Sequence, residues 1–507
     1  MGRVAATRLM VGFRRERAGD RVPRVARLKP DLLQLVGSAR ASRVARRGSP
    51  VVRLAAGILA AALLVAFPAA SSAAAESPDR PNIVLVLTDD QPFESLSRMP
   101  FVNGRKDWVR FENAFLNTPI CCPARASILN GRYSHRNHVE TNSDGSKFRD
   151  RSTVATWLQD EGYRTGFFGK YLNGYPWGRD GGGYVPPGWD RWLAFNGLPG
   201  YFNYELNKRG NGNGPAQTVA RGSLESDYST DVISRKATRF VGKAAGRSRP
   251  FFAFVSFFAP HGPAIAAPRH EQAFENEPVP NPPNFNEPDV SDKPLWIQNS
   301  PLRDPVAMAA GRRKQYELML SVDEGVRGIF ERLRASRELR RTIVIYLSDN
   351  GFLWGEHRYT GKACAYEECI QTPLLIRAPG VNARSEKALV SNVDLAPTIA
   401  RWAGARPPGN VDGRGLRRLL DGQAKRVRRT LLIHGKRPPP PDDAGQPPSF
   451  WGVRTHRFKY VETPVTEELE LYDLLNDPFE LENLAGRKAS AERLSDLGAR
   501  LAALRDK

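Results

Sequence analysis

Cysteine is scarce in this sequence, since the 507 residues include only four: Cys121, Cys122, Cys364 and Cys369. Four cysteines are too few for a small scaffold held together by disulfides. The length of the chain predicts one large domain or two unequal domains. Cys364 and Cys369 are near enough along the chain to form a local disulfide in an exported protein. Cys121 and Cys122 are adjacent and cannot easily bridge each other, so they need another explanation.

RNA- or DNA-binding motifs and internal repeats are also absent. The formal net charge is nevertheless +21, and a basic surface attracts polyanions such as nucleic acid or a sulfated glycan. A general arginine bias in composition would explain the same charge without a function. Because no recognition motif supports it, nucleic acid is excluded as a partner.

The sequence lacks an apolar run with the length and flanks of a stable membrane span. Its most apolar segment, Leu54–Ala75, follows a basic stretch, and its core ends at Phe67 before small residues. This pattern predicts a secretory signal cleaved after Ala73 or Ala75, with an uncleaved anchor as the alternative. We therefore expect residues 1–75 to be a basic leader and signal segment. The mature protein is then secreted or in the cell envelope, with no stable membrane span.

Four runs of β-branched or aromatic residues predict strands buried on both faces, as parallel strands are. They are Asn82–Leu87, Phe251–Phe258, Thr342–Leu347 and Pro373–Arg377. Helical patterns lie between them, at Ser152–Glu161, Lys236–Ala245 and Gln315–Ser336. This alternation predicts an α/β fold with a largely parallel sheet. Residues 172–215 and 262–310 are rich in Gly, Pro and Asn, which predicts long loops that shape a cleft.

The chain is expected to divide into a large domain, residues 76–434, and a smaller C-terminal subdomain, residues 435–507. The proline-rich segment 435–449 marks the boundary as a linker or exposed loop. Beyond it, the patterns predict strands and a closing helix at Trp451–Glu462, Leu469–Asp473 and Ala489–Arg505.

A pair of residues with carboxylate or amide oxygens follows each of two predicted strands. Asp89 and Asp90 come after the first, and Asp349 and Asn350 follow Thr342–Leu347. Ligands of parallel α/β sheets gather beyond the carboxyl ends of the strands, so these oxygens are expected to meet there. Four hard oxygen ligands suit Ca²⁺ or Mg²⁺, and a cation would relieve the repulsion between carboxylates. Either pair alone would more simply be a polar turn or a helix cap.

A reactive cysteine is indicated by the run Cys121-Cys122-Pro123-Ala124-Arg125. Pro123 suits the first turn of a helix, whose free N–H groups favour an anion. Arg125 adds a guanidinium that matches sulfate or phosphate oxygens. Cys121 itself could be a thiolate nucleophile or an inert buried thiol.

Cys-x-Pro-x-Arg followed by Gly131-Arg132 resembles the signature of the type I sulfatases, in the alkaline phosphatase superfamily. The resemblance covers nearly the whole mature chain and is greatest to the N-acetylglucosamine-6-sulfatase branch and its bacterial relatives. It implies an alkaline-phosphatase-like sandwich, with a large mainly parallel sheet and a smaller C-terminal antiparallel sheet plus helix. The segments that carry it are RPNIVLVLTDDQ (80–91), CCPARASILNGRYSHRNHV (121–139), GFFGKYLN (166–173), YVPPGWDRW (184–192), FAPHGP (258–263), YLSDNG (346–351), GEHRYTGK (355–362), TPLLIRAPG (372–380), VDLAPT (393–398) and ELYDLLNDPFELENL (470–484).

In this family the first cysteine is oxidised to formylglycine (3-oxoalanine) by the formylglycine-generating enzyme, and its hydrate attacks sulfur. Carried over by position, the resemblance implies that Ca²⁺ is bound by the modified Cys121 side chain with Asp89, Asp90, Asp349 and Asn350.

The resemblance also implies that Arg125, Lys170, His261 and Lys362 surround the sulfate. Arg125 would orient the formylglycine hydroxyl, and Lys170 and Lys362 would stabilise charge on the sulfuryl oxygens. His261 or Lys362 would donate a proton to the leaving alcohol.

Two positions depart from the common family pattern. Ala124 replaces the usual serine of the signature, although the modification enzyme reads Cys, Pro and Arg most strictly. Leu172 stands where many sulfatases have the histidine that breaks down the sulfated hydrate. The base is thereby unassigned, with His135, His138 and His357 as candidates.

Three functions follow for testing. The first is hydrolysis of sulfate esters, with carbohydrate sulfates such as glucosamine 6-sulfate favoured. The second is hydrolysis of phosphonate or phosphate monoesters, because tetrahedral oxyanions of similar size fit the same site. The third is a non-catalytic protein that binds sulfated glycans on an inactive scaffold.

Overall fold

The computed structural model describes residues 80–210, 212–437 and 446–506. The predicted signal segment Leu54–Ala75 and its cleavage positions lie outside these residues. Across the described parts of the chain, no helix combines the length and apolarity that crossing a bilayer requires.

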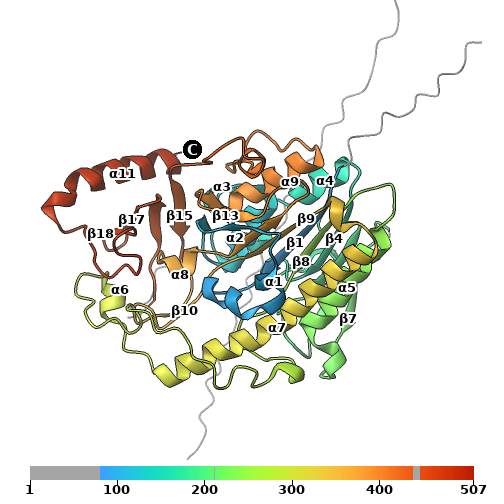
Figure 1. Ribbon diagram of the computed structural model, residues 1–507, viewed down its shortest axis with the longest axis horizontal. Coiled ribbons are helices and arrows are strands. Elements are labelled where there is room, and N and C mark those ends of the chain that lie inside the picture. Colours follow the sequence, from blue (N-terminus) through green and yellow to red (C-terminus); the bar gives the residue numbers. More distant parts are fainter. Residues whose placement is uncertain (1–79, 211, 438–445, 507) are drawn as a thin grey trace, which may run out of the picture. The chain divides into compact units, whose positions relative to one another are not determined.

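A ten-stranded mixed sheet forms the centre of the large domain (Figure 1). Its order is β13 (Arg384–Glu386), β2 (Val109–Phe111), β12 (Leu374–Arg377), β9 (Thr342–Ser348), β1 (Asn82–Thr88), β8 (Phe251–Ser256), β4 (Arg164–Gly169), β5 (Arg191–Phe195), β6 (Glu205–Arg209) and β7 (Gln217–Ala220). The five strands from β9 to β5 run parallel, as the buried apolar runs predicted.

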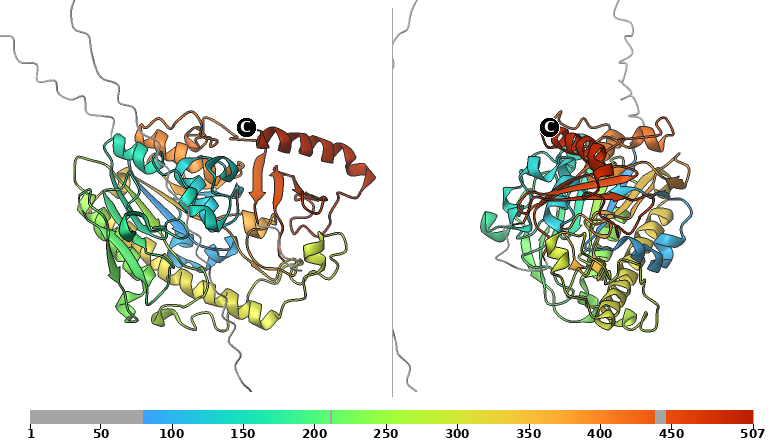
Figure 2. Two further views of the ribbon diagram at one scale, coloured as in Figure 1. Left: turned by 180° about the vertical axis from the view of Figure 1, so that it is seen from behind. Right: turned by 90° about the vertical axis from the view of Figure 1, so that its left-hand side faces the viewer.

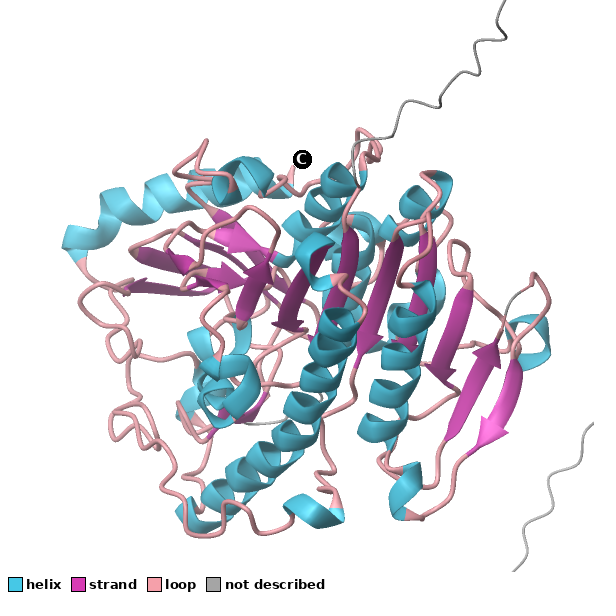
Figure 3. Ribbon diagram, turned by 45° about the vertical axis from the view of Figure 1, so that its right-hand side comes forward, coloured by secondary structure: helices cyan, strands magenta, loops and turns pink. Residues whose placement is uncertain are grey.

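Helices cover both faces of this sheet. In β1, Ile83, Leu85 and Leu87 pack into one core cluster, and Val84 and Val86 pack into another. The first core is shared with α2 (Cys121–Asn130), α4 (Val154–Asp160) and α9 (Leu395–Ala403). The second is shared with α1 (Pro100–Gly104), α5 (Ser229–Ala244) and α7 (Pro305–Ala335). Figure 3 shows the two long helices of this set in front of the sheet, running in roughly the same direction as the strands. The predicted α/β sandwich is therefore confirmed.

The C-terminal part contains the predicted antiparallel sheet and helix. The strands are β15 (Leu431–Gly435), β16 (Phe450–Arg454), β17 (Phe458–Thr463) and β18 (Glu468–Asp473). Figure 2 shows α11 (Ala491–Arg505) crossing these strands, and Leu497 and Leu501 bury its apolar side. The domain boundary at residue 435 stays a prediction.

The remaining elements are short. They are β3 (Ala114–Phe115) with β14 (Val390–Ser391), β10 (Leu353–Trp354) with β11 (Thr360–Gly361), and the helices α3 (Ser134–Asn137), α6 (Leu295–Gln298), α8 (Glu367–Ile370) and α10 (Arg417–Leu420).

Several sequence-based expectations were wrong in detail. β12 is antiparallel to both of its neighbours, although its apolar run predicted a parallel strand. The predicted loop 172–215 contains β5 and β6, and Trp451–Glu462 is a hairpin rather than one strand. Helix α7 begins ten residues before the predicted Gln315, because Asp304 caps its first turn and Pro305 fits there.

The expected disulfide between Cys364 and Cys369 is present. Replacing both residues with alanine is expected to lower the free energy of unfolding by about 2 kcal/mol, because the short covalent loop restricts the unfolded chain. Urea unfolding of parent and variant under non-reducing conditions measures this difference. Equal transition midpoints would contradict a stabilising role.

Candidate active site

Two neighbouring strands deliver the predicted acidic residues to one place. β1 and β9 pair in register, with Thr88 opposite Ser348, so Asp89 and Asp349 follow side by side. The Asp90 backbone N–H donates to Asp349 Oδ1 at 3.3 Å, and Asn350 Nδ2 donates to Asp90 Oδ1 at 2.6 Å. All four side chains are buried. The structure thus places them together at the carboxyl end of the sheet.

Cys121 is the first residue of α2 and faces this acidic group. Its thiol donates to Asp89 Oδ1 at 3.3 Å and accepts from Lys362 Nζ at 2.9 Å. Cys122 packs instead into the hydrophobic core between the sheet and α2, α4 and α9. The helix therefore separates the two adjacent thiols, one toward the polar site and one toward the core.

Arg125 lies one turn along α2 and is 2% exposed. Its Nε donates to Asp349 Oδ2 at 2.6 Å, and its Nη1 donates to Ser256 Oγ at 2.7 Å and to the Lys170 carbonyl at 2.6 Å. Its Nη2 is 3.4 Å from Asp89 Oδ2. The guanidinium thus joins the helix to the carboxyl ends of four strands of the sheet, β1, β4, β8 and β9.

Lys170 follows β4, and its ammonium forms a hydrogen bond with Asp89 Oδ2. Gly169, just before it, has φ +120°, and a Cβ added there would lie 1.7 Å from the Ser256 carbonyl oxygen. Only glycine permits this approach of two backbones. The turn fixes where the Lys170 side chain enters the site.

Gly169→Ala is expected to lower the free energy of unfolding by more than about 3 kcal/mol, because it combines backbone strain with a main-chain clash. Gly178→Ala is the matched control, since Gly178 also has positive φ, at +69°, but open space around its Cβ position. Urea denaturation of both variants measures the difference. Equal losses would show that the clash at Gly169 relaxes at little cost.

Lys362 and His261 close the site from two loops. Lys362 Nζ forms a hydrogen bond with Asp90 Oδ1 in addition to Cys121. His261 Nε2 is 3.6 Å from Asp90 Oδ2, and its side chain is 30% exposed. Tyr201 holds the loop by donating from its hydroxyl to the His261 carbonyl at 2.7 Å. His261 is therefore the partly open member of an otherwise buried group.

The charges of the site strongly perturb its titration. Burial would raise the pKa of Asp89, but Lys170, His261 and Arg125 together hold that pKa far below its usual value. Burial and the negative charge of Asp89 raise the pKa of Asp349 to about 6. Burial and Asp89 also raise the pKa of Cys121 to about 12, so its unmodified thiol is protonated at neutral pH. This argues against a simple thiolate nucleophile.

The residues at the strand ends suit a hard cation. Asp89, Asp90, Cys121 and His261 offer ligand atoms within 4.8 Å of one another. Asn350 Oδ1 is buried and accepts no hydrogen bond from the described residues. Buried polar atoms nearly always have a partner, so this oxygen is available to bind an ion. Carboxylate and amide oxygens are the ligands that Ca²⁺ prefers. Asp89, Asp90 and Asn350 therefore offer oxygen atoms that suit this ion. Both oxygens of Asp349 accept hydrogen bonds, from the Asp90 N–H and from Arg125 Nε, so its place in the ligand set stays a prediction.

The three histidines suggested as the missing base lie elsewhere. His135 packs against Trp451 in the C-terminal sheet, and His138 is an exposed residue at the end of α3. His357 is buried, bonded through Nδ1 to Glu287 at 2.8 Å, and stacked on Tyr366. These contacts favour structural roles for His135 and His357, and the position of His138 gives it no contact with the candidate site among the described residues.

Sequence reasoning missed Ser256 and Gln315. Ser256 holds Arg125 and donates from Oγ to the Lys170 carbonyl at 2.6 Å, and Gln315 Nε2 donates to the Asp90 carbonyl at 3.2 Å. Ser256 is the last residue of a strand whose position the apolar run did predict. Its side chain carries no signal of its own, because a serine at a strand end is usually a turn residue.

Comparisons with known proteins agree with this geometry. The family model described as Sulfatase matches residues 81–405, and the model described as N-sulphoglucosamine sulphohydrolase, C-terminal, matches residues 355–507. The chain is 36% identical over 353 residues to N-acetylglucosamine-6-sulfatase of Capra hircus, which covers 66% of this chain and 62% of that protein. It is 35% identical over 367 residues to the extracellular sulfatase SULF-1 homolog of Drosophila melanogaster, covering 69% of this chain and 32% of that protein. The chain thus spans less than two thirds of the length of either relative.

A solved structure has the same fold. BT4656, described in complex with its substrate D-glucosamine-2-N,6-O-disulfate, superposes with a TM-score of 0.72 at 24% identity, covering 84% of this chain and 98% of that one. The Sulfatase model alone matches well over half of the sequence. The chain therefore belongs to the sulfatase family of the alkaline phosphatase superfamily.

Proposed function

We propose that this protein hydrolyses sulfate esters of carbohydrates at the site around Cys121. The observation that carries the proposal is that Arg125, Lys170, His261 and Lys362 converge on the carboxylates of Asp89 and Asp90 beside Cys121, which Lys362 also contacts. Cations placed in a buried site stabilise the negative charge that a sulfuryl group develops on its oxygens during transfer.

The nucleophile is proposed to be formylglycine made from Cys121 by the formylglycine-generating enzyme, with the hydrated aldehyde supplying the attacking hydroxyl. The position of Cys121 supports this role, because its side chain points at the cations and Cys122 does not. The high pKa of the unmodified thiol also leaves little thiolate to act without conversion.

The four cationic side chains of the site have different proposed roles. Arg125 reaches Asp89 and Asp349, so it orients residue 121 and holds the carboxylates in place. Lys170 and Lys362 carry the ammonium groups that would neutralise the sulfuryl oxygens. His261 is partly exposed, so it can meet both the buried group and a leaving alcohol, to which it or Lys362 would donate a proton.

A Ca²⁺ ion would be held by Asp89, Asp90, Asp349, Asn350 and the modified side chain at position 121. It would supply fixed positive charge beside the reacting oxygens. The buried Asn350 Oδ1 supports its place in this ligand set.

The substrate class and location are proposed from relatives. N-acetylglucosamine-6-sulfatase is the name of one relative, and another is named an extracellular sulfatase. We therefore propose a sulfated glucosamine-type sugar as substrate and export from the cell, in line with the signal pattern of the leader.

Initial rates with nitrophenyl sulfate and nitrophenyl phosphate test the reaction class. We expect kcat/KM for the sulfate to exceed that for the phosphate by at least about tenfold, for protein produced with the formylglycine-generating enzyme in the presence of Ca²⁺. The reverse ratio would favour the phosphate or phosphonate alternative. Absence of turnover, with retained binding to sulfated glycans, would favour a non-catalytic protein.

A further inference from the structure

A cavity of about 800 Å³ lies away from the candidate active site and is lined by four arginines: Arg164, Arg209, Arg247 and Arg249. Arg164 is the first residue of β4, whereas Lys170 follows its last. A strand rises about 3.3 Å per residue, so the cavity is roughly 20 Å from the active site. It opens at the amino ends of the parallel strands, whereas the candidate active site lies at their carboxyl ends.

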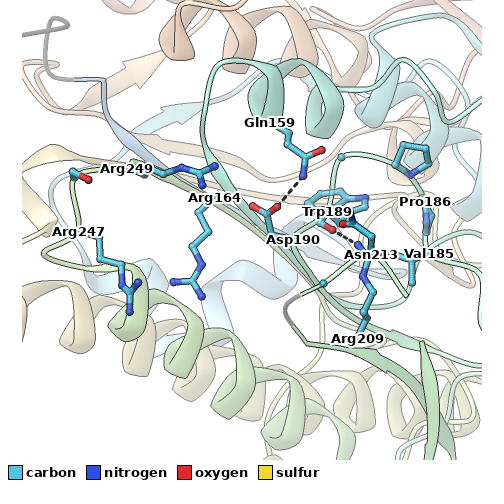
Figure 4. Close-up of a pocket in the computed structure, with 14 residues that line it drawn as sticks. Gln159, Arg164, Val185, Pro186, Trp189, Asp190, Arg209, Asn213, Arg247 and Arg249 are labelled. Carbon is cyan, nitrogen blue, oxygen red and sulfur yellow. Dashed lines mark hydrogen bonds between the residues drawn. The ribbon is translucent and has the colours of Figure 1, made fainter. Parts of the chain in front are cut away.

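The positive charge of this arginine pocket is not balanced. In Figure 4, Arg164, Arg247 and Arg249 gather on one side of Asp190, and Arg209 lies on the other. Asp190 is the one carboxylate among the described residues that line it. Within the described chain, none of the four arginines forms an ion pair, and each donates instead to a main-chain carbonyl. Burial and the nearby charges of Arg191 and Arg247 lower the pKa of Arg164, as expected where like charges crowd together.

Arginines elsewhere on the molecule are commonly paired. Arg269 bridges Asp231 and Glu324, and Arg80 pairs with Glu161 in a cavity at the same edge of the sheet. Carbonyl oxygens satisfy part of the hydrogen-bonding capacity of the four guanidinium groups but do not neutralise their charge, so crowding them around one hollow costs electrostatic energy that an anionic ligand would recover. The crowding therefore indicates a ligand with several negative charges.

The other lining residues favour a saccharide over a nucleic acid. Val185 and Pro187 add apolar surface that suits the C–H face of a sugar ring, and the Gln159 amide provides a polar group. Trp189 is the single aromatic among the described lining residues and is only 2% exposed, so no ring is free to stack on a base.

We propose that the arginine pocket is a second binding site for a sulfated polysaccharide, distinct from the reaction centre. It would hold a chain segment through guanidinium–sulfate hydrogen bonds, which form in the bidentate geometry that arginine favours. The choice of ligand rests on the proposed sulfatase function, but the pocket's affinity for polyanions does not depend on turnover.

Binding of a fluorescein-labelled heparin oligosaccharide tests the proposal by anisotropy on the full chain. The variant Arg164→Gln/Arg247→Gln/Arg249→Gln is expected to weaken binding by at least about tenfold and to flatten its salt dependence. Its matched control, Arg235→Gln/Arg239→Gln/Arg332→Gln, removes equal charge from the surface of α5 and α7 and should weaken binding by less than about twofold. Both should retain the parent rate on nitrophenyl sulfate, because neither touches the active site.

Equal losses in the two triple variants, or no loss in either, would overturn the proposal, since net charge alone would then explain binding. A single-stranded oligonucleotide that competes as well as unlabelled heparin would overturn the choice of a glycan. If the triple variant unfolds, Arg247→Gln/Arg249→Gln changes only exposed side chains and should still weaken binding by at least about threefold. A parent protein that binds heparin normally but hydrolyses no sulfate ester would refute the proposed function and leave the pocket intact.

Discussion

Cys121→Ala is expected to lower kcat/KM for sulfate esters by at least about 10⁴-fold, since it removes the proposed nucleophile. The fold should persist, because the side chain contributes contacts to Asp89 and Lys362 rather than to the apolar core. Initial rates with nitrophenyl sulfate, together with thermal unfolding of the same samples, measure both effects.

Cys122→Ala is the matched control for this experiment. Its thiol lies in the core, so we expect a loss of about 1 kcal/mol in stability and a rate within about threefold of the parent. Peptide mass spectrometry should show a loss of about 18 Da at Cys121 and none at Cys122 after conversion of thiol to aldehyde. A Cys121→Ala protein with parent activity, or conversion at Cys122, would contradict the assignment of the nucleophile.

Arg125→Lys is expected to lower the free energy of unfolding by about 3–5 kcal/mol, because one ammonium cannot replace the bonds to Asp349, Ser256 and the Lys170 carbonyl. It should also reduce kcat/KM by about 10²–10³-fold, because the ammonium keeps the charge but loses the fixed guanidinium geometry that orients residue 121. Urea unfolding and steady-state kinetics measure the two effects separately.

Arg132→Lys provides the comparison, because Arg132 follows the same helix and is only partly buried. It should change neither stability nor rate appreciably. Mass spectrometry of the Arg125→Lys protein is needed beside the kinetics, since the modification enzyme also reads this arginine. A converted Arg125→Lys protein with the stability and rate of the parent would show that the buried network is dispensable.

The sequence was most informative at the ends of the predicted strands, where polar side chains directly follow the apolar runs. The apolar runs before Asp89 and Asp349 predicted neighbouring parallel strands, and the structure pairs them in register. That one prediction brought four oxygen ligands together. The resemblance to sulfatases then placed Lys170, His261 and Lys362, which lie on loops with no periodic pattern.

Other features depend on tertiary packing and left no local signal. The direction of β12 follows from its connections, because a buried apolar run looks the same in a parallel and an antiparallel strand. The four arginines of the pocket come from the start of β4, the end of β6 and the loop before β8. In a sequence with a net charge of +21, these arginines could not be distinguished from the general excess.

The loop closed by Cys364 and Cys369 links the candidate active site to the C-terminal part, which contains β16 and β18. Lys362 stands just before it, and within it the Glu367 backbone N–H donates to Glu480 at 2.8 Å while the Glu367 side chain pairs with Arg454. Glu480 is 113 residues away from Glu367 along the sequence, so this anchoring is non-local. The segment that carries Lys362 is therefore held by contacts to the C-terminal part, and a substitution at Arg454 or Glu480 can displace this lysine although neither residue belongs to the proposed site.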